Sequence, residues 1–315
     1  SYDDSSNNHI TNAQLGVAMG EISKILGQKI DILNLDACLM QMVEVAHAVK
    51  DSVSYMVASE ELEPGKGAPY DDILAGVKNG MTPTAFAQNW VNAFAKSYNG
   101  GSQGFDESTQ SALDLSKFSP LVDAVNGLAK SLMSGKNTMV VKAALAKVQK
   151  FGDPSSIDLV HFAELLKAQT GVDASVKTAC DKVIAAVKAA IIINKTTGTT
   201  TKNSKGIAIY LPQNLMIESK YLSLSFSKAT MWDDMILALA KREAAERVVA
   251  DVIAGNLDEM RNLVADAQQN PGNEAYRIAL RELNFTMFAD KALPSNIESE
   301  FNSLFETFKN TISAK

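Results

Sequence analysis

The stretch KIDILNLDACLMQMVEVAHAVKDSVSYMVASEELE, residues 29–63, decides the fold that we predict for this chain. Residues 30–35 form an apolar run of strand length, and helical spacing begins directly after it, over residues 39–50. A second strand is predicted over residues 54–59. With the helix predicted before residue 29, the chain reads helix, strand, helix, strand. This order is typical of a parallel sheet with helical crossovers.

Local signals predict two helices around these strands. Thr11 and Gln14 match a capping box, and Gly27 can end the helix that follows in the left-handed conformation. A second helix is predicted over residues 82–98, because Pro83 stands at the favoured first position of a helix. Both helices are therefore expected to begin and end close to these residues.

The rest of the chain divides into further strands and two helical regions. Strands are predicted over residues 111–115 and 206–211, and residues 116–195 are expected to form a helical insertion or flank. We assign residues 1–243 to one domain and residues 244–315 to a helical carboxyl-terminal region. The apolar residues of that last region need a surface to bury, and packing or docking is its expected role.

Composition excludes several classes of protein. The chain has 315 residues, of which 46% are hydrophobic and 21% charged, as in an ordinary globular protein. Its net charge of −6 provides no basic footprint for nucleic acid or an anionic membrane. No apolar run reaches the roughly 18 residues of a membrane span. Because the chain begins with Ser1 and has no leader, we expect an upstream portion to be missing.

Cys38 is the first candidate for chemistry. A thiol at the end of a buried strand, beside the amino end of a helix, has its pKa lowered and favours the nucleophilic thiolate. The alternative is a small buried residue, which is the commonest role of a lone cysteine. The second cysteine, Cys180, lies in an Ala-rich helical pattern and is expected to be a core thiol. Two cysteines are too few for a disulfide scaffold.

A cysteine nucleophile requires a histidine within hydrogen-bonding reach. His47 lies nine residues after Cys38, which on one helix is roughly 13 Å along the axis and about half a revolution round it. His161 lies inside the helical flank, and His9 lies in a polar amino-terminal loop. None of the three is expected to pair with Cys38.

DACLMQMVEVAHAVKDSVSYMVASEELEPGKGAPYDDIL, residues 36–74, resembles the clostripain family of caspase-like cysteine peptidases. Weaker similarity to that family runs over residues 1–11, 108–118, 206–212 and 230–237, in family order. The resemblance implies an α/β fold, a caspase-like three-layer sandwich with a mainly parallel sheet. It also implies an endopeptidase that cleaves after Arg or Lys, with Cys38 as its catalytic nucleophile.

In that family the catalytic histidine lies upstream, in a D-H-G motif that this chain lacks. The chain therefore resembles the cysteine-bearing heavy chain of a processed zymogen and is expected to be inactive alone. The implied partner is a histidine-bearing light chain, and the implied location is secreted or in a bacterial cell envelope. No cofactor is expected. Calcium is possible by resemblance only, since the Asp3 region lacks the Gly and terminal Glu of a calcium loop.

The resemblance also implies a role for Asp36, whose family counterpart lines the S1 pocket and pairs with a substrate Arg or Lys. A recessed carboxylate can bind a guanidinium group with two hydrogen bonds. The alternative is a helix cap. Ser59, Glu60 and Glu61 are further predicted substrate-binding residues at the next strand end, and the sequence leaves open whether one of these carboxylates or Glu63 faces the pocket.

A different class of function stays open. The missing histidine would also suit a caspase-like module that binds peptides or partners without catalysis. The intact D-A-C-L-M segment argues for the enzyme, because a binding module has no need of a thiol there.

Overall fold

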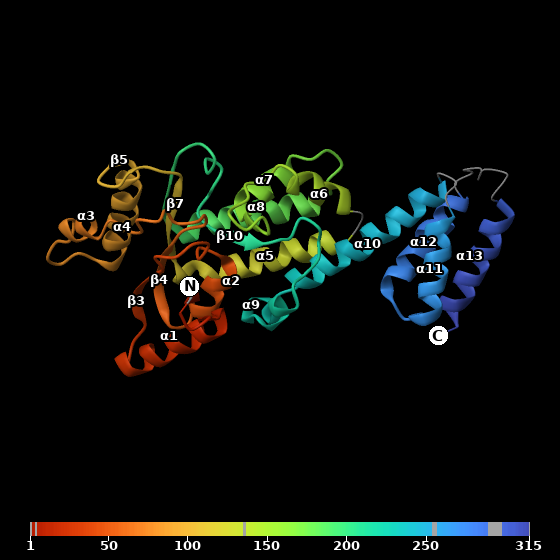
Figure 1. Ribbon diagram of the computed structural model, residues 1–315, viewed down its shortest axis with the longest axis horizontal. Coiled ribbons are helices and arrows are strands. Elements are labelled where there is room, and N and C mark those ends of the chain that lie inside the picture. The colour runs from red at the N-terminus through yellow and green to blue at the C-terminus, as the bar shows by residue number, and fades with distance from the viewer. Residues whose placement is uncertain (1, 4, 135–136, 254–256, 289–297, 315) are drawn as a thin grey trace. The chain divides into compact units, whose positions relative to one another are not determined.

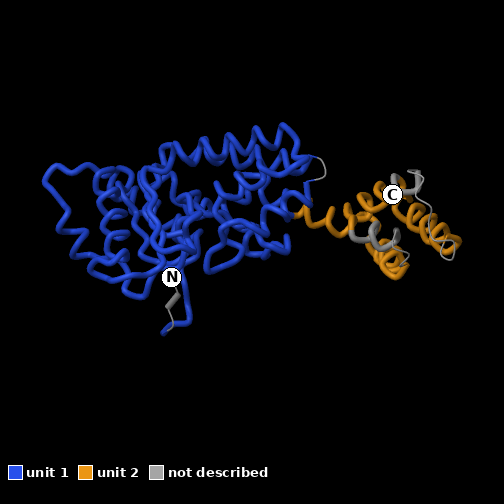
Figure 2. Tube along the Cα trace, turned by 90° about the horizontal axis from the view of Figure 1, so that it is seen from above, with its two compact units in different colours: residues 1–236 blue, residues 237–315 orange. Residues whose placement is uncertain are grey.

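The computed structural model describes residues 2–3, 5–134, 137–253, 257–288 and 298–314. The chain divides into two compact units, residues 1–236 and 237–315 (Figure 2). The division falls within helix α10 (Trp232–Ile253).

A four-stranded sheet forms the centre of the first unit (Figure 1). Its order is β3-β4-β7-β9, and the strands are β3 (Ile30–Asn34), β4 (Val53–Ala58), β7 (Ser108–Asp114) and β9 (Ile191–Thr197). β3 and β4 are parallel, whereas β7 is antiparallel to both β4 and β9. The α/β class is confirmed, but the sheet is mixed. The expected parallel character holds for the crossover from β3 through α2 (Val43–Val49) to β4. Local patterns did not determine the direction of β7 and β9.

Helices cover the sheet on both faces. α4 (Pro83–Ser97) packs through Trp90 and Phe94 against Val57 of β4. Because neighbouring residues of a strand point to opposite faces, the fully buried Met56 shows that the other face of β4 is covered too. α1 (Asn12–Leu26) packs on α2 and on β3. The result is the layered arrangement of a caspase-like sandwich.

The predicted helix caps are confirmed. The Thr11 hydroxyl accepts from the Gln14 amide at 3.2 Å, and the Gln14 side chain accepts from the Thr11 amide at 2.9 Å. Gly27 then takes a φ of 68°, the left-handed conformation that lets the chain leave the helix. Thr82 caps α4, with Pro83 at its start.

The helical region contains four helices and ends in a strand. The helices are α5 (Phe118–Met133), α6 (Thr138–Leu145), α7 (Leu159–Lys167) and α8 (Ala174–Ala190). The helical prediction for residues 116–195 is therefore wrong at its end, where Ile191 begins β9 of the main sheet. Three consecutive isoleucines, residues 191–193, favour a strand there.

The predicted strand over residues 206–211 is shorter and belongs elsewhere. β10 (Ala208–Tyr210) pairs antiparallel with β8 (Ser156–Asp158), outside the main sheet. The remaining elements of the first unit are β1 (Tyr2–Asp3), β2 (Asn8–His9), α3 (Tyr70–Ala75), β5 (Asn99–Gly101), β6 (Gly104–Phe105), the 3₁₀ helices η1 (Leu115–Lys117) and η2 (Ser219–Ser223), and α9 (Ser225–Ala229).

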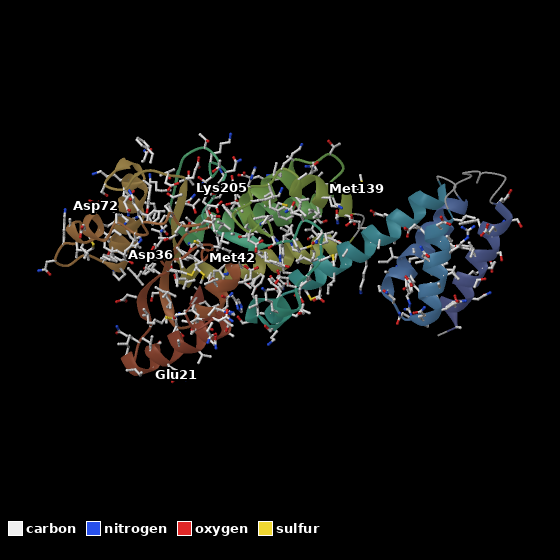
Figure 3. All side chains as sticks on the ribbon, in the orientation of Figure 1. Glu21, Asp36, Met42, Asp72, Met139 and Lys205 are labelled. Atoms are coloured by element: carbon white, nitrogen blue, oxygen red, sulfur yellow. The ribbon has the colours of Figure 1, made fainter. Side chains whose placement is uncertain are left out.

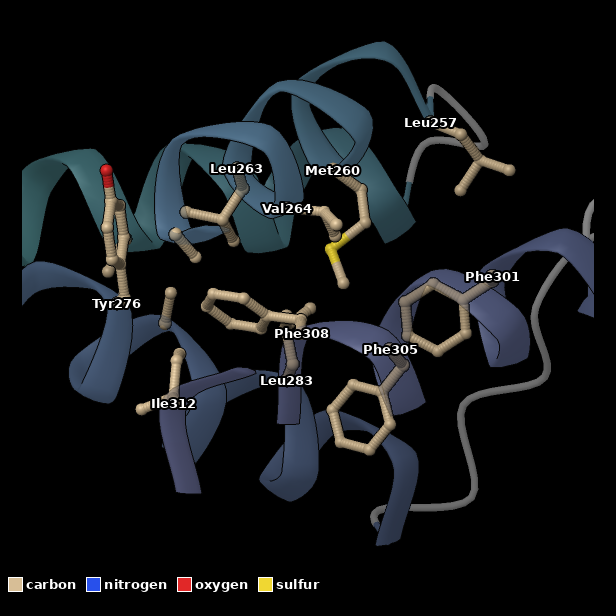
Figure 4. Packing of buried hydrophobic residues seen from close by; sticks show 13 residues of the cluster. Leu257, Met260, Leu263, Val264, Tyr276, Leu283, Phe301, Phe305, Phe308 and Ile312 are labelled. Atoms are coloured by element: carbon tan, nitrogen blue, oxygen red, sulfur yellow. The ribbon is translucent and has the colours of Figure 1, made fainter. Parts of the chain in front are cut away.

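The second unit is helical and has its own core (Figure 4). Besides the end of α10 it contains α11 (Asp258–Gln269), α12 (Glu274–Phe288) and α13 (Glu298–Ser313). Phe301, Phe305 and Phe308 of α13 pack with Met260 of α11 and Leu283 of α12. The apolar residues of this region thus bury one another. Among the helices that the structure describes, none is long and apolar enough to cross a membrane.

Candidate active site

The turn between β3 and α2 carries both Asp36 and Cys38. Figure 3 labels Asp36, near the start of this turn, and Met42, at its end. α2 (Val43–Val49) begins at Val43, so the predicted helix start directly after Cys38 is wrong. Leu39 has a φ of 60°, a left-handed conformation that interrupts the helical path. The Leu39 amide donates to the Glu61 carbonyl at 3.1 Å, which holds the turn against the chain that leaves β4.

Cys38 is exposed, and its sulfur accepts a hydrogen bond from the Glu63 amide at 3.3 Å. It is therefore not a buried filler. The donor beside the thiol is this loop amide, not the helix end that the sequence suggested. Cys180, by contrast, is the predicted core thiol: it is fully buried, and burial raises its pKa to about 12. Only the thiolate is nucleophilic, so Cys180 is inert at neutral pH.

Three residues of the segment that follows β4 hold Asp36, the last of them being the first residue of α3. Its Oδ2 accepts from the Tyr70 hydroxyl at 2.8 Å and from the Ala68 amide at 3.3 Å, and its carboxyl group also contacts that of Glu63. Hydrogen bonding to Glu63, Tyr70 and Ala68 lowers the pKa of Asp36 despite partial burial. Since α2 begins at Val43, the alternative role of Asp36 as a helix cap is wrong. The structure presents an ionised carboxylate two residues from an exposed thiol.

Glu63 is the strand-end carboxyl group that reaches Asp36. Its Oε1 accepts from the Gln110 side chain at 3.2 Å. Its Oε2 is buried and receives no hydrogen bond from a donor among the described residues. Burial, together with the contact with Asp36, raises the pKa of Glu63 to about 9. At neutral pH Glu63 is therefore protonated, and the Asp36–Glu63 pair has one negative charge.

Gly67 closes the loop that brings these groups together. Its φ of 65° is a conformation that favours glycine, and an added Cβ would lie 3.2 Å from the Asp36 carboxylate. Its carbonyl accepts from the Tyr98 hydroxyl at 2.7 Å and from the Gln103 side chain at 2.8 Å. The loop is thus anchored to the end of α4 and to the β5–β6 turn.

The structure corrects the predicted role of Ser59 and shows that Glu61 bonds to the helical region. Ser59 is fully buried, and its hydroxyl bonds with Thr109 at 2.8 Å and donates to the Glu61 carbonyl at 3.0 Å. It stabilises the turn after β4 and is not accessible to a substrate. Glu61 is half-buried, and its Oε1 accepts from the Gly152 amide at 2.8 Å. That bond joins the turn to the helical region.

Glu60 is also turned inward, which corrects its predicted contact with substrate. It is 1% exposed, and its Oε2 accepts from the Gly206 amide at 2.9 Å. Its carboxyl group contacts that of Asp158, which caps α7 by accepting from the His161 amide. Burial and the neighbouring Asp158 raise the pKa of Glu60 well above its ordinary value. This buried acid pair joins the end of β4 to α7.

Replacement of Glu60 by Gln is expected to change how stability depends on pH. A carboxyl group with a raised pKa binds its proton more tightly in the folded state, so its stabilising effect is complete below the unfolded pKa and is lost as pH rises through the folded pKa. Relative to wild type, Glu60→Gln should gain up to about 1.4 kcal/mol per pH unit as pH rises above the unfolded pKa, the limit for one proton. Urea unfolding at several pH values measures this. Glu21→Gln, an exposed control, should run parallel to wild type; a parallel curve for Glu60→Gln would contradict the buried proton.

The three histidines lie on three different elements, α2, α7 and β2. His47 bonds through Nδ1 to the Ser225 hydroxyl at 2.8 Å, and its ring packs against Phe226. His161 accepts from the Gln149 amide at 2.9 Å. His9 lies in β2 and, with Leu39 and Met42, lines a cavity of about 390 Å³. As predicted, His47 and His161 are engaged away from Cys38.

Known proteins resemble the chain over this same region. A sequence model of the clostripain family, also designated peptidase family C11, matches residues 1–239. The chain belongs to the clostripain family. The match spans the Cys38 turn, the Asp36 cluster and the main sheet, and ends within α10. A search among curated proteins gives no match.

Solved structures of clostripain-family proteases share the fold. A clostripain from Bacteroides thetaiotaomicron, in complex with the peptide inhibitor BTN-VLTK-AOMK, aligns at a TM-score of 0.57 and 16% identity over 73% of this chain and 98% of its own. A cysteine protease of B. fragilis aligns at a TM-score of 0.56 and 21% identity, over 74% of this chain and 97% of its own. A secreted C11 protease of B. thetaiotaomicron, bound to an irreversible peptide inhibitor, aligns at a TM-score of 0.53 and 20% identity. This alignment covers 72% of this chain and 65% of that protease.

Sequence reasoning missed two members of the site. They are Tyr70, which bonds to Asp36, and Gln110, which bonds to Glu63 and lies beside the predicted third strand. Tyr70 does lie within residues 36–74, the segment that resembles the clostripain family. Nothing local marked Gln110. Among the described residues, no group of three or more His, Cys, Asp or Glu side chains could hold a metal ion.

Proposed function

We propose that this clostripain-family chain is the cysteine-bearing part of an endopeptidase that cleaves after Arg or Lys. The observation that carries the proposal is the pairing, on one turn, of the exposed Cys38 thiol with the ionised Asp36. The Cys38 thiolate attacks the scissile carbonyl carbon, and the carbonyl oxygen becomes an oxyanion that the Cys38 amide can stabilise. Collapse forms a thioester and expels the amine, which takes a proton from a histidine. Water then hydrolyses the thioester and regenerates the thiol.

Asp36 supports the preference for a basic P1 residue. A fixed carboxylate that already accepts from Tyr70 and Ala68 keeps lone pairs for a guanidinium or ammonium group. The inhibitor bound to the B. thetaiotaomicron clostripain has a peptide part, VLTK, that ends in lysine. Both observations favour a positively charged substrate side chain at P1.

We assign the catalytic histidine to an upstream portion or light chain. His47 and His161 have other partners, and β3 is an edge strand among the strands that the structure describes. Apolar side chains of α1 are exposed beside that edge, Ile25 being 83% exposed. An open edge with exposed apolar residues is a surface that a protein normally covers.

Co-production with the upstream portion tests this assignment. The two parts together should release a reporter group from Arg and Lys peptide substrates, whereas the chain alone should not. His9→Ala in the complete enzyme is the matched control and should retain activity, because the base comes from the other part. Activity of the chain alone that disappears in His9→Ala would contradict the assignment. Absence of cleavage by both parts together would favour a caspase-like module that binds peptides without catalysis.

The remaining proposals concern location and ions. We propose that the enzyme is secreted or held in a bacterial cell envelope, and the secreted C11 protease among the similar structures supports this. We propose catalysis without a cofactor. Retention of activity after exhaustive chelation of calcium would support that, and loss of activity restored by calcium would overturn it.

A further inference from the structure

Glu63 links the two groups that the proposed function requires. Its backbone amide donates to the Cys38 sulfur at 3.3 Å, and its side chain contacts the carboxyl group of Asp36. Its Oε1 accepts from the side chain of Gln110, on β7, at 3.2 Å. One residue is thus connected to the proposed nucleophile, the proposed P1 carboxylate and the central sheet.

The contact between the two carboxyl groups requires a proton. The donors to Asp36 are Tyr70 and Ala68, and the donor to Glu63 is Gln110. The buried Oε2 of Glu63 receives none of these bonds. Two bare carboxylates in contact would repel each other, so a proton on Glu63 that is donated to Asp36 is the arrangement that satisfies both.

The surrounding titratable groups are compatible with that proton. Tyr70 and Tyr98 face the pair as neutral phenols. The pKa of Tyr70 is raised mainly by its bond to Asp36, and that of Tyr98 mainly by burial; the charges of Asp36 and Glu63 raise both further. Lys66, on the same loop, directs its ammonium group to the Gln103 carbonyl at 3.0 Å. Cys38 lies at the Glu63 amide, away from the carboxyl contact.

We propose that Glu63 is a positioning residue for P1 recognition: its protonated carboxyl donates to Asp36 and fixes that carboxylate between Tyr70 and Ala68. The cluster then has a single negative charge, which one Arg or Lys side chain neutralises. This inference rests on the proposed function and adds a specificity-determining residue to it. It predicts that a hydrogen-bond donor is needed at position 63, and that an ionisable group is not.

Three variants of the complete enzyme test the requirement for a donor. Glu63→Gln keeps a donor and should retain kcat/KM for an Arg reporter substrate within about threefold, whereas Glu63→Ala should lose about tenfold or more. The loss should fall mainly on KM for Arg and Lys substrates and leave a citrulline substrate unchanged. Asp71→Asn removes an exposed acid from α3 and should match wild type. Melting temperatures establish that all variants are folded.

Infrared spectroscopy tests the proton directly, without any substrate. The difference spectrum of wild type minus Glu63→Gln at pH 7 should contain the carbonyl stretch of a carboxylic acid, and the band should titrate with a midpoint near 9. Subtraction of the variant removes other protonated carboxyl groups such as Glu60. Absence of the band would overturn the inference.

Failure of this inference and failure of the proposed function give different results. If wild type cleaves neither Arg nor Lys substrates, the proposed function fails, and the infrared band still reports the proton. If wild type cleaves them but Glu63→Ala is equally active, the positioning role is overturned. It is also overturned if Glu63→Gln loses as much activity as Glu63→Ala, because donation to Asp36 would then not be what matters.

Discussion

Replacement of Cys38 by alanine in the complete enzyme is expected to lower kcat for Arg and Lys reporter substrates by about 1,000-fold or more, the scale on which removal of a nucleophile acts. The thiol is exposed at a turn with no structural role beyond accepting from the Glu63 amide. The variant should therefore melt close to wild type. Steady-state kinetics with the same reporter substrates measure the loss.

Cys180→Ala is the matched control for this experiment. Cys180 is fully buried in α8, and its thiol is held in the protonated form. Its removal should lower stability by about 1 kcal/mol through lost packing and leave kcat per folded enzyme unchanged. Cleavage that survives Cys38→Ala, or that disappears in Cys180→Ala, would assign the chemistry to another group.

Replacement of Asp36 by asparagine is expected to lower kcat/KM for Arg and Lys substrates by about 100-fold or more, because a charge-assisted pair with the P1 cation is lost. The asparagine oxygen can still accept from Tyr70 and Ala68, so the fold of the loop should persist. A citrulline substrate, which matches arginine in shape without its charge, should change by less than about threefold. Kinetics on the three substrates give the comparison.

A double variant sharpens this prediction. Asp36 contributes to the raised pKa of Glu63, so Asp36→Asn should allow Glu63 to ionise nearer neutral pH and to supply part of the missing charge. Asp36→Asn combined with Glu63→Gln should therefore retain less activity on Arg substrates than Asp36→Asn alone. An equal loss on Arg and citrulline substrates would mean general damage to the site and would contradict the role of Asp36.

Some elements of the fold could be predicted because their signals are local. The Thr11 capping box and the Pro83 helix start depend on residues within one turn of each other, and both are present. The strands β3 and β4 follow from short apolar runs. The start of α2 could not be predicted in this way, because the left-handed residue is Leu39, which is not a helix breaker and is held by a backbone bond to the distant Glu61.

The acids after β4 show the limit of reasoning from sequence. Glu60, Glu61 and Glu63 are equivalent by composition and position, yet Glu60 bonds to Gly206, 146 residues away, and Glu61 bonds to Gly152, 91 residues away. Of these three residues, Glu63 is the one whose carboxyl group contacts Asp36. Contacts of this length depend on how the helical region packs on the sheet, which no local pattern contains.

The sequence by itself determined the family, the α/β class, the strand that presents Cys38 and the proximity of Asp36 to it, since these follow from periodicity, helix caps and a contiguous motif. Tertiary structure alone decided that the thiol is exposed, that β7 and β9 make the sheet mixed, and that Glu63 and Tyr70 surround Asp36. The physical reason is that burial and hydrogen bonding between distant segments are properties of the packed chain. A carboxyl group's charge and direction are settled only by the groups that fold around it.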